Sequence, residues 1–157
     1  MMAKNGSVNV NDLKEFKKKI ENTLGASQID LFIESCAKEL AARLLAKVIK
    51  RTPVGQYPKS SGKKGGTLRR GWTGEKSQSA SAYAQGLKVN HFGNVYVIEI
   101  INPVPYAPHV EFGHRTRGGD GWVEGKFMLT ISEQEIERDA PKILENKLKK
   151  KLGECFK

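Results

Sequence analysis

Two histidines in residues 105–117 (PYAPHVEFGHRTR) are the first candidates for chemistry in this sequence. His109 and His114 lie five positions apart. In a strand this spacing places two side chains on opposite faces, and in a helix it rotates them well apart. A metal ion holds its nitrogen ligands at about 2 Å, so the spacing argues against shared ligation of one ion. The sequence predicts no metal site here.

Glu111 stands between two apolar residues, Val110 and Phe112. In a strand that buried these neighbours, the carboxylate would point to the opposite face and into solvent. The functional alternative is a salt bridge, within the chain or to another subunit, with an arginine such as Arg69 or Arg70. The sequence leaves both interpretations open.

The usual signatures of an active site are missing from the sequence. There is no Ser-His-Asp order and no recognisable pair of catalytic carboxylates. Residues 62–66 (GKKGG) look like a phosphate-binding loop, but no strand pattern precedes them and the GKS or GKT ending is missing. Cys36 and Cys155 follow no metal-ligand spacing, which is typical of inert thiols in an intracellular protein. We expect no enzyme activity and no cofactor.

Composition and charge narrow the class of protein. A chain of 157 residues is long enough for one domain with a real core, although its hydrophobic fraction is only 38%. It carries 27 Lys and Arg against 17 Asp and Glu, a formal charge of +10. This excess favours acidic partners, but scattered cations that only keep the protein soluble fit the count equally well. The sequence has neither an apolar run of membrane-spanning length nor a signal-peptide pattern, so we expect no membrane partner.

The basic residues fall into three clusters, at positions 59–70, 115–117 and 147–151. Tyr57 and Trp72 flank the first cluster and could stack on bases. No motif that reads DNA or RNA sequence is present, so such a contact would be electrostatic and nonspecific. The candidate DNA contacts are Lys59, Lys63 and Lys64.

Helical periodicity dominates the first third of the sequence. Residues 1–10 are predicted to be disordered. Apolar residues at spacings of three and four then predict a short helix that ends at Gly25. Ser27 and Asp30 resemble a capping box at the start of a longer helix, which Pro53 would stop.

The middle of the sequence favours loops and strands. Residues 55–66 are rich in glycine, serine and lysine and predict a mobile basic loop. Residues 95–101 (VYVIEII) form the only unbroken β-type run and predict a strand, paired antiparallel with residues 87–89 across a turn at 91–94. The prolines and Gly113 of residues 105–117 predict an irregular, apolar-anchored segment that leads into a mobile basic loop at the sheet edge.

The last third returns to helix. Residues 122–123 are predicted to pair briefly, and a helix is expected from Lys126 onward, with a kink or break at Pro141 and a tail at residues 153–157. Residues 11–152 therefore predict one α+β domain. In it a long N-terminal helix and a C-terminal helix pack a small antiparallel β-sheet, and long basic loops project.

Four stretches follow one another in a distinctive order. They are RTPV at 51–54, GGTLRRGW at 65–72, PYAPHVEFGHRTR at 105–117 and GKFMLTISEQEIE at 125–137. Together they resemble the tail-completion or neck proteins of tailed phages and prophages, also called head–tail joining proteins or minor tail components. The resemblance spans roughly residues 31–152.

The resemblance implies a structural protein of the virion neck, assembled in the host cytoplasm. It would form a ring, with a hexamer favoured, between the head connector and the tail. Its partners would be further copies of itself, the connector or head-closure protein, and a tail-tube or tail-terminator protein. In the family the Thr-Pro-Val turn runs within a few residues into Gly-Thr-Leu-Arg, whereas residues 55–64 enlarge the loop here. The alternative function is nonspecific DNA binding by the basic loops.

Ring assembly implies contact residues on each copy, because a closed ring joins two different surfaces of every subunit. An apolar-anchored edge with basic arms suits such a contact. The candidate inter-subunit or connector contacts are Thr67, Leu68, Arg69, Arg70, Trp72, Tyr106, His109, Glu111, Phe112, His114, Arg115 and Arg117.

Overall fold

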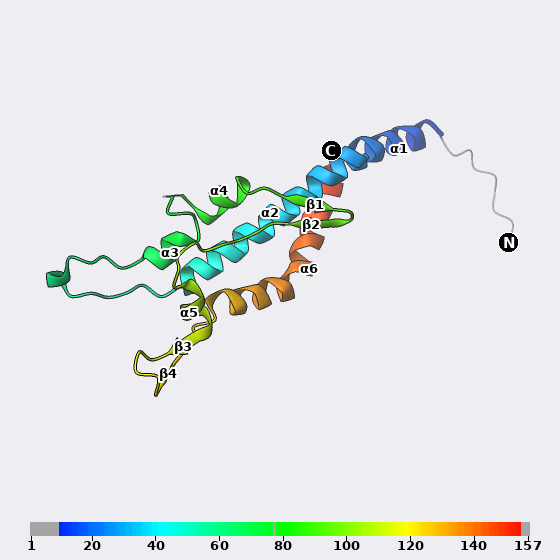
Figure 1. The fold of residues 1–157 in the computed structure, drawn as a ribbon. Coiled ribbons are helices and arrows are strands. Elements are labelled where there is room, and N and C mark those ends of the chain that lie inside the picture. The colour runs from blue at the N-terminus through cyan, green and yellow to red at the C-terminus, as the bar shows by residue number, and fades with distance from the viewer. Residues whose placement is uncertain (1–9, 77, 155–157) are drawn as a thin grey trace.

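A computed structural model describes residues 10–76 and 78–154 of the chain (Figure 1). The predictions of disorder over residues 1–9 and of a tail over 155–157 fall outside the described residues. Helices predominate in the described part, and none of its helices is long and apolar enough to cross a membrane.

A long helical spine begins the fold, as predicted. Helix α1 (Val10–Leu24) and helix α2 (Ala26–Arg51) are separated only by Gly25, and Figure 1 shows α1 continuing away from the body of the molecule. The predicted capping box of Ser27 and Asp30 is wrong. The extended backbone of Gly25 starts α2 before the serine, and no side chain caps the helix.

Two short helices lie between the spine and the first strands. Helix α3 (Thr67–Gly71) follows a long loop that contains the 3-10 turn η1 (Lys59–Ser61) and projects beyond the helices in Figure 1. Helix α4 (Ala80–Gln85) packs along α2. Ser79 starts α4, because its hydroxyl accepts a hydrogen bond from Ala82 N at 3.1 Å.

The predicted hairpin exists, but its first strand lies a few residues later in the chain than predicted. Strand β1 (Asn90–Phe92) pairs antiparallel with β2 (Val95–Val97), so residues 87–89 are not a strand and the predicted turn is shorter. Gly93, at φ 61°, makes the turn possible. Only the first three residues of the run 95–101 are paired.

The segment expected to be irregular forms a helix and a second hairpin. Helix α5 (Ala107–Phe112) tolerates Pro108 because the first helical turn needs no amide donor there. Strand β3 (Gly113–Arg115) pairs antiparallel with β4 (Trp122–Glu124), which confirms the predicted pairing around Trp122.

Helix α6 (Met128–Glu154) closes the fold and continues into the predicted tail. A break at Pro141 was one of the predicted alternatives, but α6 is a single helix through this residue. Figure 1 shows the helix change direction along its length, as a proline that lacks the amide donor requires.

The core lies where α2 meets the short helices and the start of α6. The α+β class is confirmed, although the strands form two separate two-stranded sheets and not one sheet. The buried cluster consists of Ala41, Leu45, Val48, Leu68, Trp72, Ala84, Val104, Ala107 and Met128.

Candidate functional site

Thr52, just after α2, joins two of the sequence motifs. Its Oγ1 donates to Val48 O at 2.6 Å and accepts from the indole Nε1 of Trp72 at 2.8 Å. Its carbonyl accepts from Nε and Nη2 of Arg69 at 3.2 and 2.7 Å. Thr52 and Trp72 are both buried. The Thr-Pro turn and the TLRRGW stretch are therefore held together inside the chain.

The segment before α5 reaches the same place through Asn102. Its Nδ2 donates to Leu68 O at 2.8 Å, and its Oδ1 accepts from Val104 N at 3.1 Å. This approach requires glycine at position 71, because a Cβ on Gly71 would overlap the Asn102 amide oxygen. Three stretches distant in sequence thus meet at one point.

Glu111 binds the start of α6, so the prediction of a solvent-exposed carboxylate is wrong, and within the described residues it forms no ion pair with Arg69 or Arg70. It is only 5% exposed. Its carboxylate accepts hydrogen bonds from Leu129 N at 2.9 Å, from Thr130 N at 2.8 Å and from Thr130 Oγ1 at 2.6 Å. It therefore caps the N-terminus of α6 and satisfies two amides that the helix itself leaves without acceptors. A strand pattern could not reveal this, because Glu111 lies on a helix and its partners follow 18 residues or more later in the chain.

Two glycines allow α5, the β3–β4 hairpin and α6 to close on one another. Gly113 ends α5 at φ 87°, and a Cβ there would collide with Val123 O. A Cβ on Gly125 would overlap Glu111 O. The backbone then locks the join, because Lys126 N donates to Val110 O at 2.7 Å. We call the set Thr52, Leu68, Arg69, Trp72, Asn102 and Glu111 the motif junction.

All six residues of the motif junction lie within a stretch of the chain that matches a known protein family. The family model described as "Bacteriophage HK97-gp10, putative tail-component" matches residues 14–113 of the chain. The chain belongs to this family. The match includes α2, α3 and α5, and it confirms the resemblance to phage tail proteins. No curated protein and no solved structure matches the chain.

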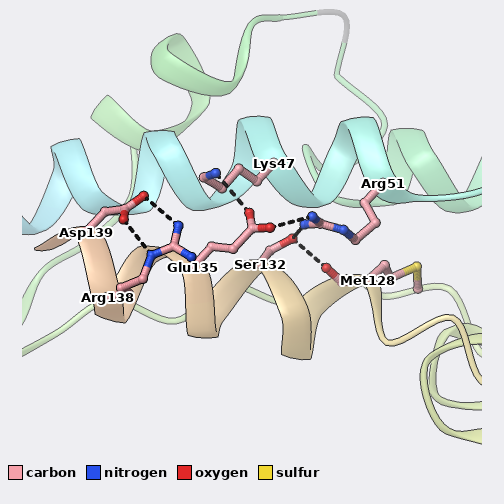
Figure 2. Close-up of polar contacts among 7 residues, drawn as sticks. All are labelled: Lys47, Arg51, Met128, Ser132, Glu135, Arg138 and Asp139. Carbon is pink, nitrogen blue, oxygen red and sulfur yellow. Dashed lines mark hydrogen bonds and ion pairs between the residues drawn. The ribbon is translucent and has the colours of Figure 1, made fainter.

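In this HK97-gp10-like tail component, ion pairs fasten α6 to α2. Glu135 accepts from Lys47 Nζ at 2.9 Å and from Arg51 Nη2 at 2.8 Å (Figure 2). These two hydrogen bonds lower the pKa of the Glu135 carboxyl below its ordinary value. Arg51 Nη1 also donates to Ser132 Oγ at 2.7 Å, and Ser132 donates to Met128 O at 2.6 Å. The start of α6 is thus held both by Glu111 and by α2.

The predicted contact residues divide into two groups. Leu68, Trp72 and Glu111 are buried in the chain, and the guanidinium of the half-buried Arg69 binds Thr52 O. The side chains of these four residues are therefore used within one copy. The other eight, which are exposed or half-buried, are Thr67, Arg70, Tyr106, His109, Phe112, His114, Arg115 and Arg117.

His109 and His114 lie together, contrary to the spacing argument. Their ring centroids are 5.7 Å apart. The argument assumed one continuous element, whereas the chain leaves α5 at Gly113 and folds back as β3. Among the described residues of this chain, no group of three or more His, Cys, Asp or Glu side chains could hold a metal ion.

The HK97-gp10-like chain also exposes several apolar side chains in residues 112–131, of which only Phe112 was among the predicted contacts. Phe112 is 61% exposed and Trp122, on β4, is 56% exposed. Val123, Phe127 and Ile131 are exposed beside them in sequence. The sequence contained one signal for this exposed surface, namely the two apolar residues Trp122 and Val123 in a short, otherwise polar hairpin. A strand with a single partner strand cannot bury both of its faces, so such residues stay exposed. We call residues 113–124 the ribbon.

The basic loop is a second projecting segment, which we call the basic arm (residues 53–66). Lys59, Lys63 and Lys64 are exposed on it. The outgoing and returning segments of the arm meet at its base, where Gly65 lies so close to Gly55 O that no side chain fits at position 65. No observation on the described residues favours DNA over another acidic partner for these lysines.

Proposed function

We propose that this phage tail component is a structural protein of the virion neck, which assembles as a ring, with a hexamer favoured, and joins the head connector to the tail. The family match over residues 14–113 carries the proposal. The neck position, the ring and the assembly in the host cytoplasm go beyond that match. The role is structural, and no step of it requires a catalytic group or a cofactor.

The arrangement of the chain supports this role. The motif junction and the ion pairs between α2 and α6 make a body in which the buried polar side chains of the described residues all have partners. From that body the basic arm and the ribbon project in different directions (Figure 1). A ring requires two different surfaces on each copy, and two separate projections can supply them.

The contact residues we propose are the exposed members of the original set. On and beside the ribbon, Phe112 supplies apolar area and Arg115 and Arg117 supply charge. Tyr106, His109 and His114 lie in the same stretch of chain, and Thr67 with Arg70 lies at the base of the basic arm. Their partners would be a second copy, the connector or head-closure protein, or the tail-tube or tail-terminator protein.

Lys59, Lys63 and Lys64 would face the channel through which DNA passes. The contact would be with phosphates and independent of base sequence. It is a passage contact within the neck, and affinity for DNA is not the main role of the protein. Tight binding to duplex DNA at physiological salt in a gel-shift assay would reverse this order and favour the DNA-binding alternative.

Deletion of the gene from a phage or inducible prophage tests the proposal. We expect full heads and free tails that fail to join, visible by electron microscopy of the lysate, and rescue by the gene supplied in trans. Cryo-electron microscopy of the rescued particles should then show the protein as a ring at the neck. Normally joined particles after deletion, or a position elsewhere in the tail, would refute the neck assignment and leave the family membership intact.

A further inference from the structure

The most β-prone run of the chain is left half paired. Residues 95–97 pair with β1, but none of the hydrogen bonds among the described residues uses the backbone of residues 98–101. Figure 1 shows this part of the chain running alongside α2 after β2. Each of its four residues therefore keeps a free N–H donor and a free C=O acceptor. We call residues 98–101 the open edge.

The side chains of the open edge alternate as they would in a strand. Ile98 and Ile100 are half-buried and pack against the core, whereas Glu99 and Ile101 are exposed. Ile101 is 62% exposed, which is unusual for so apolar a residue. The segment is thus held extended, with one face on the core and its backbone available to another strand.

The ribbon is the second incomplete sheet of the chain. All three residues of β4 are exposed, and among the described residues β4 pairs with β3 alone. A two-stranded ribbon is marginal in water on its own, because most of its apolar surface and one edge of each strand stay solvated. The open edge and the ribbon belong to different sheets, so neither completes the other within one copy.

We propose that β4 of one copy adds as a strand to the open edge of a second copy. This inference rests on the proposed ring, and it names the surfaces that build it. Because the two surfaces differ, the contact is head-to-tail, and such contacts close into rings when the rotation between copies permits. Pairing satisfies those free backbone groups of residues 98–101 that point towards the added strand, and it covers Ile101 with Trp122 or Val123.

Charge favours a second copy as the occupant. Glu99 is an exposed carboxylate with no ion pair to any described residue. Arg115 and Arg117, on the ribbon, are exposed and likewise make no ion pair within the described part of the chain. Addition of β4 in the orientation that sets Arg115, the partner of Trp122, beside Glu99 brings opposite charges together, and Glu124 at the end of β4 then lies away from Glu99.

Glu99→Pro tests the hydrogen bonds of the open edge. Proline removes the amide donor and blocks an added strand, whereas Glu99→Thr removes the same carboxylate and keeps the donor. Because Glu99 N makes no hydrogen bond to any described residue, the two variants should unfold at similar denaturant concentrations. In native mass spectrometry and sedimentation, Glu99→Pro should weaken self-association about tenfold or more relative to Glu99→Thr.

A disulfide tests the pairing directly. With Cys155 replaced by Ser, the double variant Glu99→Cys and Val123→Cys should form covalent chains of two or more copies under mild oxidation, and each single variant should not. Rings that form equally well with Glu99→Pro, or assembled protein that never cross-links, would overturn this contact and leave the ring proposal standing. A wild-type protein that neither self-associates at high concentration nor joins tails would overturn the ring itself.

Discussion

The motif junction and the two projecting segments use similar residues in opposite ways. At the junction, the side chains of Trp72, Arg69 and Glu111 form hydrogen bonds with backbone and side-chain groups of the same copy. On the ribbon, Trp122 and Arg115 occupy paired positions of the hairpin and both are exposed. Residue type alone does not separate the two roles. What separates them is whether a second segment of the same chain lies within reach.

This difference separates the role of the sequence motifs from that of the projecting segments. The Thr-Pro, TLRRGW and VEFG motifs hold α2, α3, α5 and α6 in place, which is a task within one copy. We propose that contacts with partners are made instead by the basic arm, the ribbon and the open edge. Substitutions at the junction should therefore reduce stability, whereas substitutions on the projections should reduce assembly and leave stability unchanged.

Glu111→Ala should have the largest effect on stability. It leaves Leu129 N, Thr130 N and Thr130 Oγ1 without their acceptor at the start of α6. We expect the free energy of unfolding, measured with a chemical denaturant, to fall by about 3 kcal/mol. Glu133→Ala, on the exposed face of α6, is the matched control and should change it by less than ~0.5 kcal/mol. Equal effects of the two would remove the distinction between junction and surface.

Gly113→Ala should follow, with a loss of about 2 kcal/mol in the free energy of unfolding. The added methyl group collides with Val123 O, and the φ of 87° is strained for any residue with a Cβ. Gly118→Ala, in the loop of the same ribbon, is the control, because no atom lies within 4 Å of the added Cβ. A Gly113→Ala protein as stable as Gly118→Ala would show that the ribbon is not locked to α5.

The ion pairs between α2 and α6 should give a smaller effect that depends on pH. Hydrogen bonds from Lys147 and Arg43 lower the pKa of Glu39, and those from Lys47 and Arg51 lower that of Glu135. Since the pKa of each carboxyl is lower in the folded state, the pairs stabilise the fold above the ordinary value of 4.5 and are lost as the pH falls through the folded values.

Unfolding free energies measured from neutral pH to below 4.5 should therefore fall less steeply in the double variant Glu39→Gln and Glu135→Gln than in the wild type. Both carboxylates are partly exposed, so salt should shrink the difference. An identical pH profile for the two proteins would show that these pairs add nothing to the helix contact.

The smallest effect on stability is expected on the basic arm. Replacing Lys59, Lys63 and Lys64 together by Gln should shift the free energy of unfolding by less than ~0.5 kcal/mol, because all three are exposed. Particle assembly should proceed, while delivery of DNA, measured as infectious units per assembled particle, should fall. A loss of stability as large as that of Glu111→Ala would contradict the division between junction and projections.

Local signals in the sequence determined the three long helices and the family. Apolar spacing predicted α1, α2 and α6, Gly25 and Pro53 marked the ends of α1 and α2, and the four motif stretches pointed to the phage tail proteins. Such signals depend on residues within a few turns of one another. The hairpin of β1 and β2 was predicted but placed a few residues early, because β propensity does not set the register.

Only the tertiary structure decided what the motif residues do. Glu111 meets α6, Trp72 meets Thr52, and His109 meets His114 because segments far apart in the chain, or a turn between two elements, bring them together. The helical and strand periodicity of the sequence does not indicate these contacts between distant segments. Their energy comes from burial and hydrogen bonds between elements, which exist only once the helices have packed, and the same packing determines which strand edges stay open.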